Sequence, residues 1–165
     1  MTQSLTVKRP TWNDEMKKEL AKIVGKQVHE WCKQDDTPLE DCIETAEKIL
    51  EYHSNDNGYE LAKEFEDEGY SPDSELVEIL DSVSYDKSEV QKTFIKKWVA
   101  DNNLKLELVE GQKVVAKLYL KGEFEGEIVK LYPETMQYGF WHEGQSYGKG
   151  QGHTYVNFEN IVRVI

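Results

Sequence analysis

The side chains that most often perform chemistry in proteins are few and scattered in this sequence. It contains four histidines and two cysteines: His29, His53, His142, His153, Cys32 and Cys42. None lies at the spacing of a zinc-binding, thiol-redox or calcium-binding motif. His53 continues an apolar helical stripe, so we expect it in a core or at its border rather than as a ligand. The sequence therefore predicts no metal site, no cofactor and two buried, reduced thiols.

Two other patterns could suggest catalysis, and neither does so on inspection. The glycine-rich segment GQSYGKGQG at 144–152 lacks the Ser or Thr and the following helix of a phosphate-binding loop, so we expect a hairpin loop. Carboxylates are abundant, but acid–base catalysis needs two of them in different environments. A crowd of solvated acids does not provide this, so we expect no catalytic residue and no enzyme.

The distribution of charge is the most informative property of the chain. The formal net charge is −12. Residues 35–89 carry nineteen Asp and Glu against three Lys, a net charge of −16, whereas the flanking segments are close to neutral. An acidic block this concentrated indicates a surface that attracts a basic partner or repels an acidic one.

The acids of this block fall at helical spacing. Glu40, Glu44, Glu47 and Glu51 follow i, i+4, i+7 and i+11, which places them in one stripe on a helix. Like charges at this spacing destabilise a helix, so the pattern needs a reason other than folding. The predicted acidic surface consists of Asp35, Asp36, Glu40, Asp41, Glu44, Glu47, Glu51, Asp56, Glu60, Glu64, Glu66, Asp67, Glu68, Asp73, Glu75, Glu78 and Asp81.

Helices must position these acids, because apolar residues recur at helical spacing up to about residue 102. The expected helices span 14–33, 38–53, 59–68, 73–83 and 86–101. Thr37 is the expected N-cap of the second helix, with Pro38 as its first residue. Tyr59 is expected on the buried face of the third helix.

From about residue 104 the apolar period changes to two, which is typical of strands. Five or six short strands in 62 residues indicate a small antiparallel barrel, and the pattern resembles an SH3-like barrel. The predicted fold class is therefore α+β, with an acidic helical domain over 1–103 and an SH3-like β-barrel over 104–165. No apolar run is long enough to cross a membrane, and the first residues lack a secretory signal, so a cytoplasmic protein is expected.

Aromatic residues of the predicted barrel offer a second candidate surface. They are Tyr138, Phe140, Trp141, Tyr147 and Tyr155. They either fill the barrel core and ordinary strand surface, or form a groove that binds a peptide or nucleic acid.

One stretch of the acidic block resembles a known family. EFEDEGYSPDS, from Glu64 to Ser74, is similar to the E-F-E-D-x-G-x-x-P-D-T stretch of the phage overcome-classical-restriction proteins. The resemblance extends over about residues 35–85. It implies a helical dimer that imitates bent duplex DNA and blocks type I restriction enzymes of the bacterial host. At matching positions, Glu64, Glu66, Asp67 and Asp73 would imitate phosphates. That family lacks a barrel and has no counterpart to the basic helix at 86–101.

Three functions fit these patterns. In the first, the chain is a phage-encoded DNA mimic that occupies the DNA-binding groove of a host restriction or related defence enzyme and does not itself bind DNA. In the second, it is an adaptor whose barrel binds a protein or nucleic acid while the acidic helices only solvate it. In the third, it is an acidic regulator of RNA polymerase or of a nucleoid protein.

Overall fold

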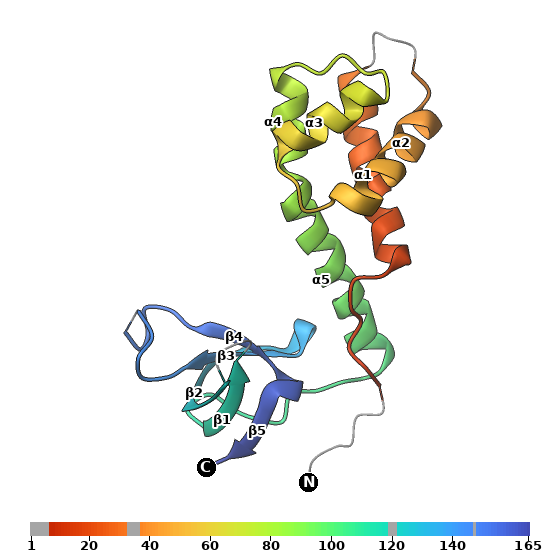
Figure 1. The fold of residues 1–165 in the computed structure, drawn as a ribbon. Coiled ribbons are helices and arrows are strands. Elements are labelled where there is room, and N and C mark those ends of the chain that lie inside the picture. The colour runs from red at the N-terminus through yellow and green to blue at the C-terminus, as the bar shows by residue number, and fades with distance from the viewer. Residues whose placement is uncertain (1–6, 33–36, 119–121, 147) are drawn as a thin grey trace. The chain divides into compact units, whose positions relative to one another are not determined.

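The computed structural model describes residues 7–32, 37–118, 122–146 and 148–165, and it confirms an α+β fold with helices first and strands last (Figure 1). The helices are α1 (Asp14–Trp31), α2 (Leu39–His53), α3 (Gly58–Asp67), α4 (Ser74–Asp81) and α5 (Val83–Asp101). The strands are β1 (Lys113–Leu118), β2 (Gly122–Tyr132), β3 (Gln137–Trp141), β4 (Thr154–Asn157) and β5 (Ile161–Val164), with short 3-10 helices η2 (Pro133–Thr135) and η3 (Phe158–Asn160). No helix in these ranges combines the length and hydropathy that crossing a membrane requires.

The chain forms two compact units, and their boundary lies inside α5. Lys8–Phe94 form the helical unit, whereas Ile95–Ile165 and Val7 form the sheet unit. The sequence placed the division at residue 103, where the apolar period changes. Packing changes earlier than the period, because Trp98 and Val99 of α5 pack with Met136 in a core cluster of the sheet unit.

The helical unit is built on close contact between α1 and α2. Gly25 of α1 allows it, since a Cβ there would lie 2.6 Å from the Cα of Ile43. Met16, Leu20, Val24 and other apolar residues of α1 to α4 then form one buried cluster with Val83 and Val90 of α5. The predicted apolar stripes are therefore the real core, except that Tyr59 is 60% exposed rather than buried.

A second close contact joins α3 to α4. A Cβ on Gly58 would lie 2.3 Å from the carbonyl oxygen of Val77. The Gly58 amide donates a hydrogen bond of 2.7 Å to Oδ1 of Asp81, the last residue of α4. Three helix starts are capped by side chains: Asn13, Asn57 and Asp73 accept from the amides of Met16, Glu60 and Leu76.

The start of α2 differs from the predicted one. Its N-cap is Pro38, which makes no side-chain capping bond, and the first helical residue is Leu39. The expected N-cap at Thr37, with Pro38 as the first helical residue, is therefore wrong. The side chain of Glu40 stays exposed in the first turn, where a negative charge is favourable to the helix dipole.

The sheet unit contains one antiparallel sheet with the strand order β4-β3-β2-β1-β5. The described strands leave β4 and β5 as open edges, so the ladder does not close into the barrel that the sequence indicated. Val114, Ala116, Ile128, Tyr138 and Phe140 form the core on its inner face. The period of two in the sequence also predicts Leu120 on this face, and this residue lies outside the described residues.

Candidate functional site

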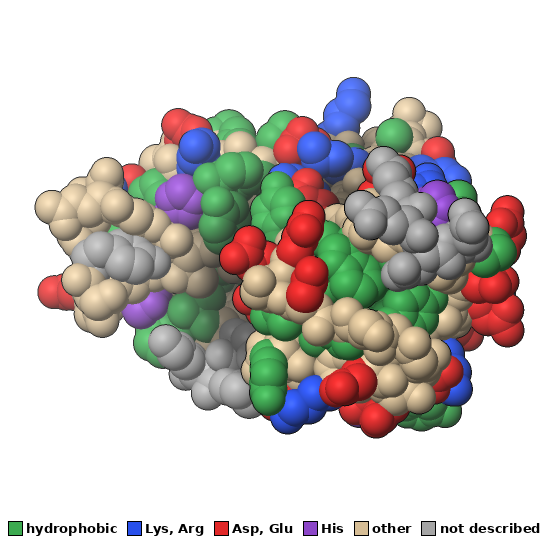
Figure 2. Space-filling model, turned by 90° about the horizontal axis from the view of Figure 1, so that it is seen from above, with side chains coloured by type: hydrophobic (Ala, Val, Ile, Leu, Met, Phe, Trp, Pro, Cys, Tyr) green, Lys and Arg blue, Asp and Glu red, His purple; other side chains and the backbone are tan. Residues whose placement is uncertain are grey.

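The predicted acidic surface lies on the helical unit, and most of it is exposed. Asp56 and Glu64 are half-buried, and the other described acids of the set are exposed. Asp35 and Asp36 lie outside the described residues. Figure 2 shows Asp and Glu side chains in several groups, with hydrophobic side chains at the surface between them. The acids differ in their contacts, and these contacts separate two roles.

Nine of these acids make no ion pair with any described residue, and we call them the open carboxylates. They are Glu40, Asp41, Glu44, Glu47, Glu51, Glu66, Asp67, Glu75 and Glu78. Five of them belong to α2, where the four glutamates repeat every three or four residues. At ~1.5 Å per residue this is a charge every ~4.5–6 Å along the helix axis, compared with ~3.4 Å per phosphate along one DNA strand. The stripe is therefore somewhat sparser than a phosphate backbone.

Four other acids of the set are involved in ion pairs. Glu60 lies 3.7 Å from the Lys63 ammonium of the same helix, and Glu68 pairs with Lys48 of α2. The other two, Asp56 and Glu64, face His53. Helix α1 has ion pairs of the same kind. The ammonium groups of Lys17 and Lys22 lie 3.4 and 3.5 Å from carboxylate oxygens of the acids three residues earlier. Paired acids of this kind attract a basic partner less than the open carboxylates do.

Two acids of the set hold the fold together. Oδ1 of Asp73 caps α4 by accepting from the Leu76 amide at 3.0 Å, and it also accepts from Nε1 of Trp31 at 3.0 Å. The Leu76 bond is the main cause that lowers the pKa of Asp73 below its ordinary value, so this carboxylate stays ionised. Asp81 binds the Gly58 amide, as described above. Removing either carboxylate therefore affects folding as well as surface charge.

His53 is the titratable centre of this surface. Its Nδ1 lies 2.8 Å from Oδ2 of Asp56, and its Nε2 lies 3.7 Å from Oε2 of Glu64. The hydrogen bond to Asp56 is the main cause that raises the pKa of His53 above its ordinary value. As expected from the sequence, the ring lies at the border of the core and is half-buried. Its protonation neutralises part of the charge at the end of α2.

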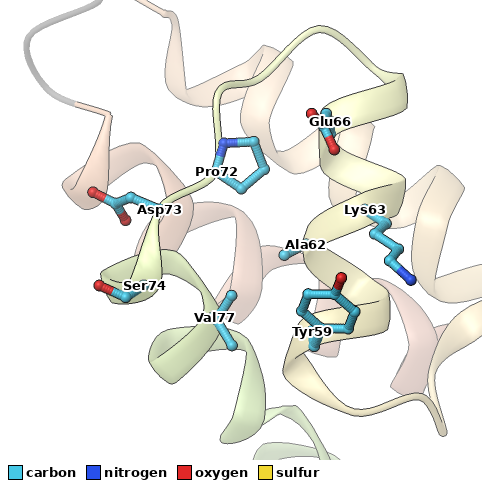
Figure 3. A pocket seen from close by; sticks show the side chains of 8 residues that line it. All are labelled: Tyr59, Ala62, Lys63, Glu66, Pro72, Asp73, Ser74 and Val77. Atoms are coloured by element: carbon cyan, nitrogen blue, oxygen red, sulfur yellow. The ribbon is translucent and has the colours of Figure 1, made fainter.

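A groove of about 340 Å³ lies between α3 and α4 (Figure 3). Its lining combines apolar atoms, one aromatic ring and charged groups. The lining residues are Tyr59, Ala62, Lys63, Glu66, Pro72, Asp73, Ser74 and Val77. The Lys63 ammonium lies 4.4 Å from the centre of the Tyr59 ring, and the figure shows this side chain extending away from Pro72 and Val77. Glu66 lies on the α3 side of the groove, and Asp73 lies at the start of α4 with its carboxylate pointing away from the groove.

The aromatic residues predicted in the barrel divide between its two faces. Tyr138 and Phe140 are 3% and 0% exposed and belong to the core, so they do not form a partner surface. Trp141 is half-buried, Tyr155 is 59% exposed, and Tyr147 lies outside the described residues. Successive side chains of a strand point to opposite faces of the sheet. The sequence of β3 was therefore sufficient to place Tyr138 and Phe140 on one face and Trp141 on the other.

The sequence analysis missed two residues that surround Tyr155. The Tyr132 hydroxyl lies 2.7 Å from Nε2 of His153, and the ring centres of Tyr132 and Tyr155 are 5.0 Å apart. Gly139 leaves room for His153, since a Cβ there would lie 2.8 Å from Cδ2 of the imidazole. We call Tyr132, His153 and Tyr155 the aromatic cluster. The spacing of two between His153 and Tyr155 was the available signal, whereas Tyr132 belongs to β2, which β3 separates from β4.

Comparisons of the chain with protein-family models, with curated proteins and with solved structures give no match. Within the described ranges no group of three or more His, Cys, Asp or Glu side chains could hold a metal ion. The two cysteines, both buried, are free, and their sulfur atoms are 3.8 Å apart. What remains as a site is the acidic surface with the groove that lies within it.

Proposed function

We propose that the chain is a DNA mimic, a protein that binds the DNA-binding groove of another protein through the open carboxylates. The observation that carries the proposal is that nine exposed acids of α2, α3 and α4 have no ion-pair partner among the described residues. By sequence, Lys8–Phe94 hold 23 acidic and 11 basic side chains, which is the whole net charge of −12. The sheet unit holds nine of each and is neutral.

The chemistry of such a complex is electrostatic and involves no catalysis. Lysines and arginines that normally contact phosphates would meet carboxylates at similar intervals. Each exposed ion pair contributes only ~0–1 kcal/mol, so the affinity is the sum of many contacts and falls steeply with salt. The same charges repel phosphate, so the chain is expected not to bind duplex DNA at physiological salt.

The partner class follows from the resemblance of Glu64–Ser74 to the overcome-classical-restriction proteins. It directs the proposal to a type I restriction enzyme of a bacterial host, and a chain that blocks one would be an anti-restriction protein. Independently of this resemblance, the open carboxylates suit any protein with a lysine- and arginine-rich DNA groove, including RNA polymerase or a nucleoid protein.

The test compares two variants that lose the same charge in different places. The first replaces five open carboxylates by their amides: Glu44, Glu47, Glu51, Glu66 and Asp67. The matched control replaces five exposed acids of the sheet unit by Gln: Glu107, Glu110, Glu123, Glu125 and Glu143. Both change the formal net charge from −12 to −7.

The measurement is inhibition of DNA binding and DNA cleavage by a purified type I restriction enzyme at several salt concentrations. We expect inhibition by the wild type and the control variant, and strong loss of inhibition in the first variant. Equal inhibition by the two variants, or inhibition that does not depend on salt, would contradict the mimic proposal. If the chain inhibits another DNA-binding protein but not the restriction enzyme, the proposed partner changes and the proposed mechanism of DNA mimicry stands.

The aromatic cluster favours a second function, that of an adaptor whose sheet binds a protein or nucleic acid. Tyr155 is 59% exposed and lies beside Tyr132 and His153 on one sheet face. In that case Tyr155→Ala would abolish partner binding and the five amide substitutions on the helical unit would not. The two functions therefore predict opposite outcomes for the same pair of variants.

A further inference from the structure

The groove between α3 and α4 has a composition that suits one kind of side chain. Its walls include the Tyr59 ring, and Pro72, Val77 and Ala62 supply apolar atoms. The Tyr59 ring is 60% exposed, so a partner can reach it. Glu66 places a carboxylate on the α3 side of this space, whereas the carboxylate of Asp73 points away from it (Figure 3) and accepts from the Leu76 amide and Trp31. A ligand must therefore combine an apolar stem, a flat face for the ring and a positive charge.

We propose that this groove binds an arginine side chain of the partner and selects it over lysine. The inference rests on the proposed function, because the partner is the basic protein that the open carboxylates attract. Arginine has a methylene stem for Pro72 and Val77, a planar guanidinium that stacks on an aromatic face, and a fork of donors that a carboxylate such as that of Glu66 can accept. The ammonium of lysine offers a point charge and no planar face.

The molecule already uses the Tyr59 ring to hold a cation. The Lys63 ammonium lies 4.4 Å from the ring centre and 3.7 Å from a carboxylate oxygen of Glu60. The Tyr59 ring is therefore placed where a cation–π contact forms. The Lys63 side chain extends away from Pro72 and Val77, which line the groove (Figure 3). Charge complementarity supports a cationic occupant, since the helical unit carries the entire net negative charge of the chain.

The experiment uses two probes of equal charge, a nona-arginine and a nona-lysine peptide, with the full-length protein at low salt. Fluorescence anisotropy gives the two dissociation constants. For the wild type we expect nona-arginine to bind about two- to fivefold more tightly than nona-lysine, which corresponds to one exposed cation–π contact. Tyr59→Leu should remove this preference mainly by weakening the binding of nona-arginine, and Tyr59→Phe should restore it.

The control is Tyr52→Leu, which removes a tyrosine that is 78% exposed and does not line the groove. The preference for arginine should survive this change. Thermal melts of all variants establish that each is folded. We expect this result because both tyrosine rings are exposed, so replacing them removes little packing. An equal affinity of the wild type for the two peptides would overturn the arginine groove and leave the open carboxylates as a general cation surface. Binding of neither peptide would overturn the groove and the proposed function together.

Discussion

Neutralising part of the α2 stripe should make the protein more stable. The change is the triple substitution of Glu44, Glu47 and Glu51 by Gln, which leaves Glu40 in the first turn, where its charge favours the helix. It removes four like-charge pairs at i, i+3 or i+4, counting Asp41 with Glu44, each worth ~0.2–0.5 kcal/mol, so about 0.8–2 kcal/mol in all. Glu51 also lies in the last turn, where a negative charge opposes the helix dipole by ~0.3–1 kcal/mol.

Two attractions to Lys48 oppose this gain. Glu44 is four residues before Lys48 in the favourable orientation, and Glu51 is three residues after it, so each substitution loses an attraction of ~0.2–0.5 kcal/mol. The ammonium of Lys48 is also held by Glu68, which stays in place. The expected net increase in the free energy of unfolding is therefore about 1 kcal/mol at low salt.

The assay is urea unfolding followed by helical circular dichroism, at low salt and in 1 M NaCl. Salt at this concentration reduces the screening length to ~3 Å, so the difference between variant and wild type should largely disappear. The control is Asp81→Ala, which also removes negative charge but breaks the hydrogen bond to the Gly58 amide and should lower stability. An unchanged or lower stability of the triple variant at low salt would refute the reasoning, because it would mean that the three carboxylates have stabilising partners.

Three further predictions follow from the helical unit. Gly25→Ala should destabilise it by ~1–3 kcal/mol in urea unfolding, because the new methyl group meets backbone atoms on α2 and one element must move. The pKa of His53, measured by NMR titration, should lie above ~6.5, and Asp56→Asn should lower it. The stability that protonation of His53 contributes is complete below its unfolded pKa and is lost as the pH rises through its folded pKa, so Asp56→Asn should matter most at acidic pH. Burial raises the pKa of the Cys42 thiol to about 11, so iodoacetamide at pH 8.5 should label it far more slowly in the native than in the unfolded protein. A linked loss of stability is expected as the pH rises from about 9 through about 11, since the unfolded thiol ionises first.

Much of the fold could be predicted because periodicity is a local property. The change from a helical period to a period of two was sufficient to place helices before strands. The boundary of the packed units was not predictable in the same way, because it depends on contacts between distant residues such as Trp98 and Met136. The start of α2 was missed because Thr37 and Pro38 satisfy the sequence pattern of a cap without making its hydrogen bond.

The acidic surface was predictable as a set but not in the roles of its members. Spacing places Glu44 and Asp81 equally well on helix surfaces. Only the structure shows that Asp81 accepts from a backbone amide 23 residues away and that Glu44 has no ion-pair partner in the described chain. Tyr59 was assigned to the core because an aromatic residue at the edge of an apolar stripe fits the pattern of a buried one. Its exposure depends on how α4 lies against α3.

The division of the acids into open carboxylates and structural ones has an evolutionary consequence. A surface recognised through its overall charge tolerates exchange of Asp for Glu and movement of an acid by one helical turn, because no single position is read by itself. Asp81 and Gly58 have no such freedom, since one hydrogen bond and one close approach between α3 and α4 depend on them. In descendants of this chain, the glycines and the structural acids should therefore stay fixed while the open carboxylates drift, so that selection preserves a charge density rather than a motif.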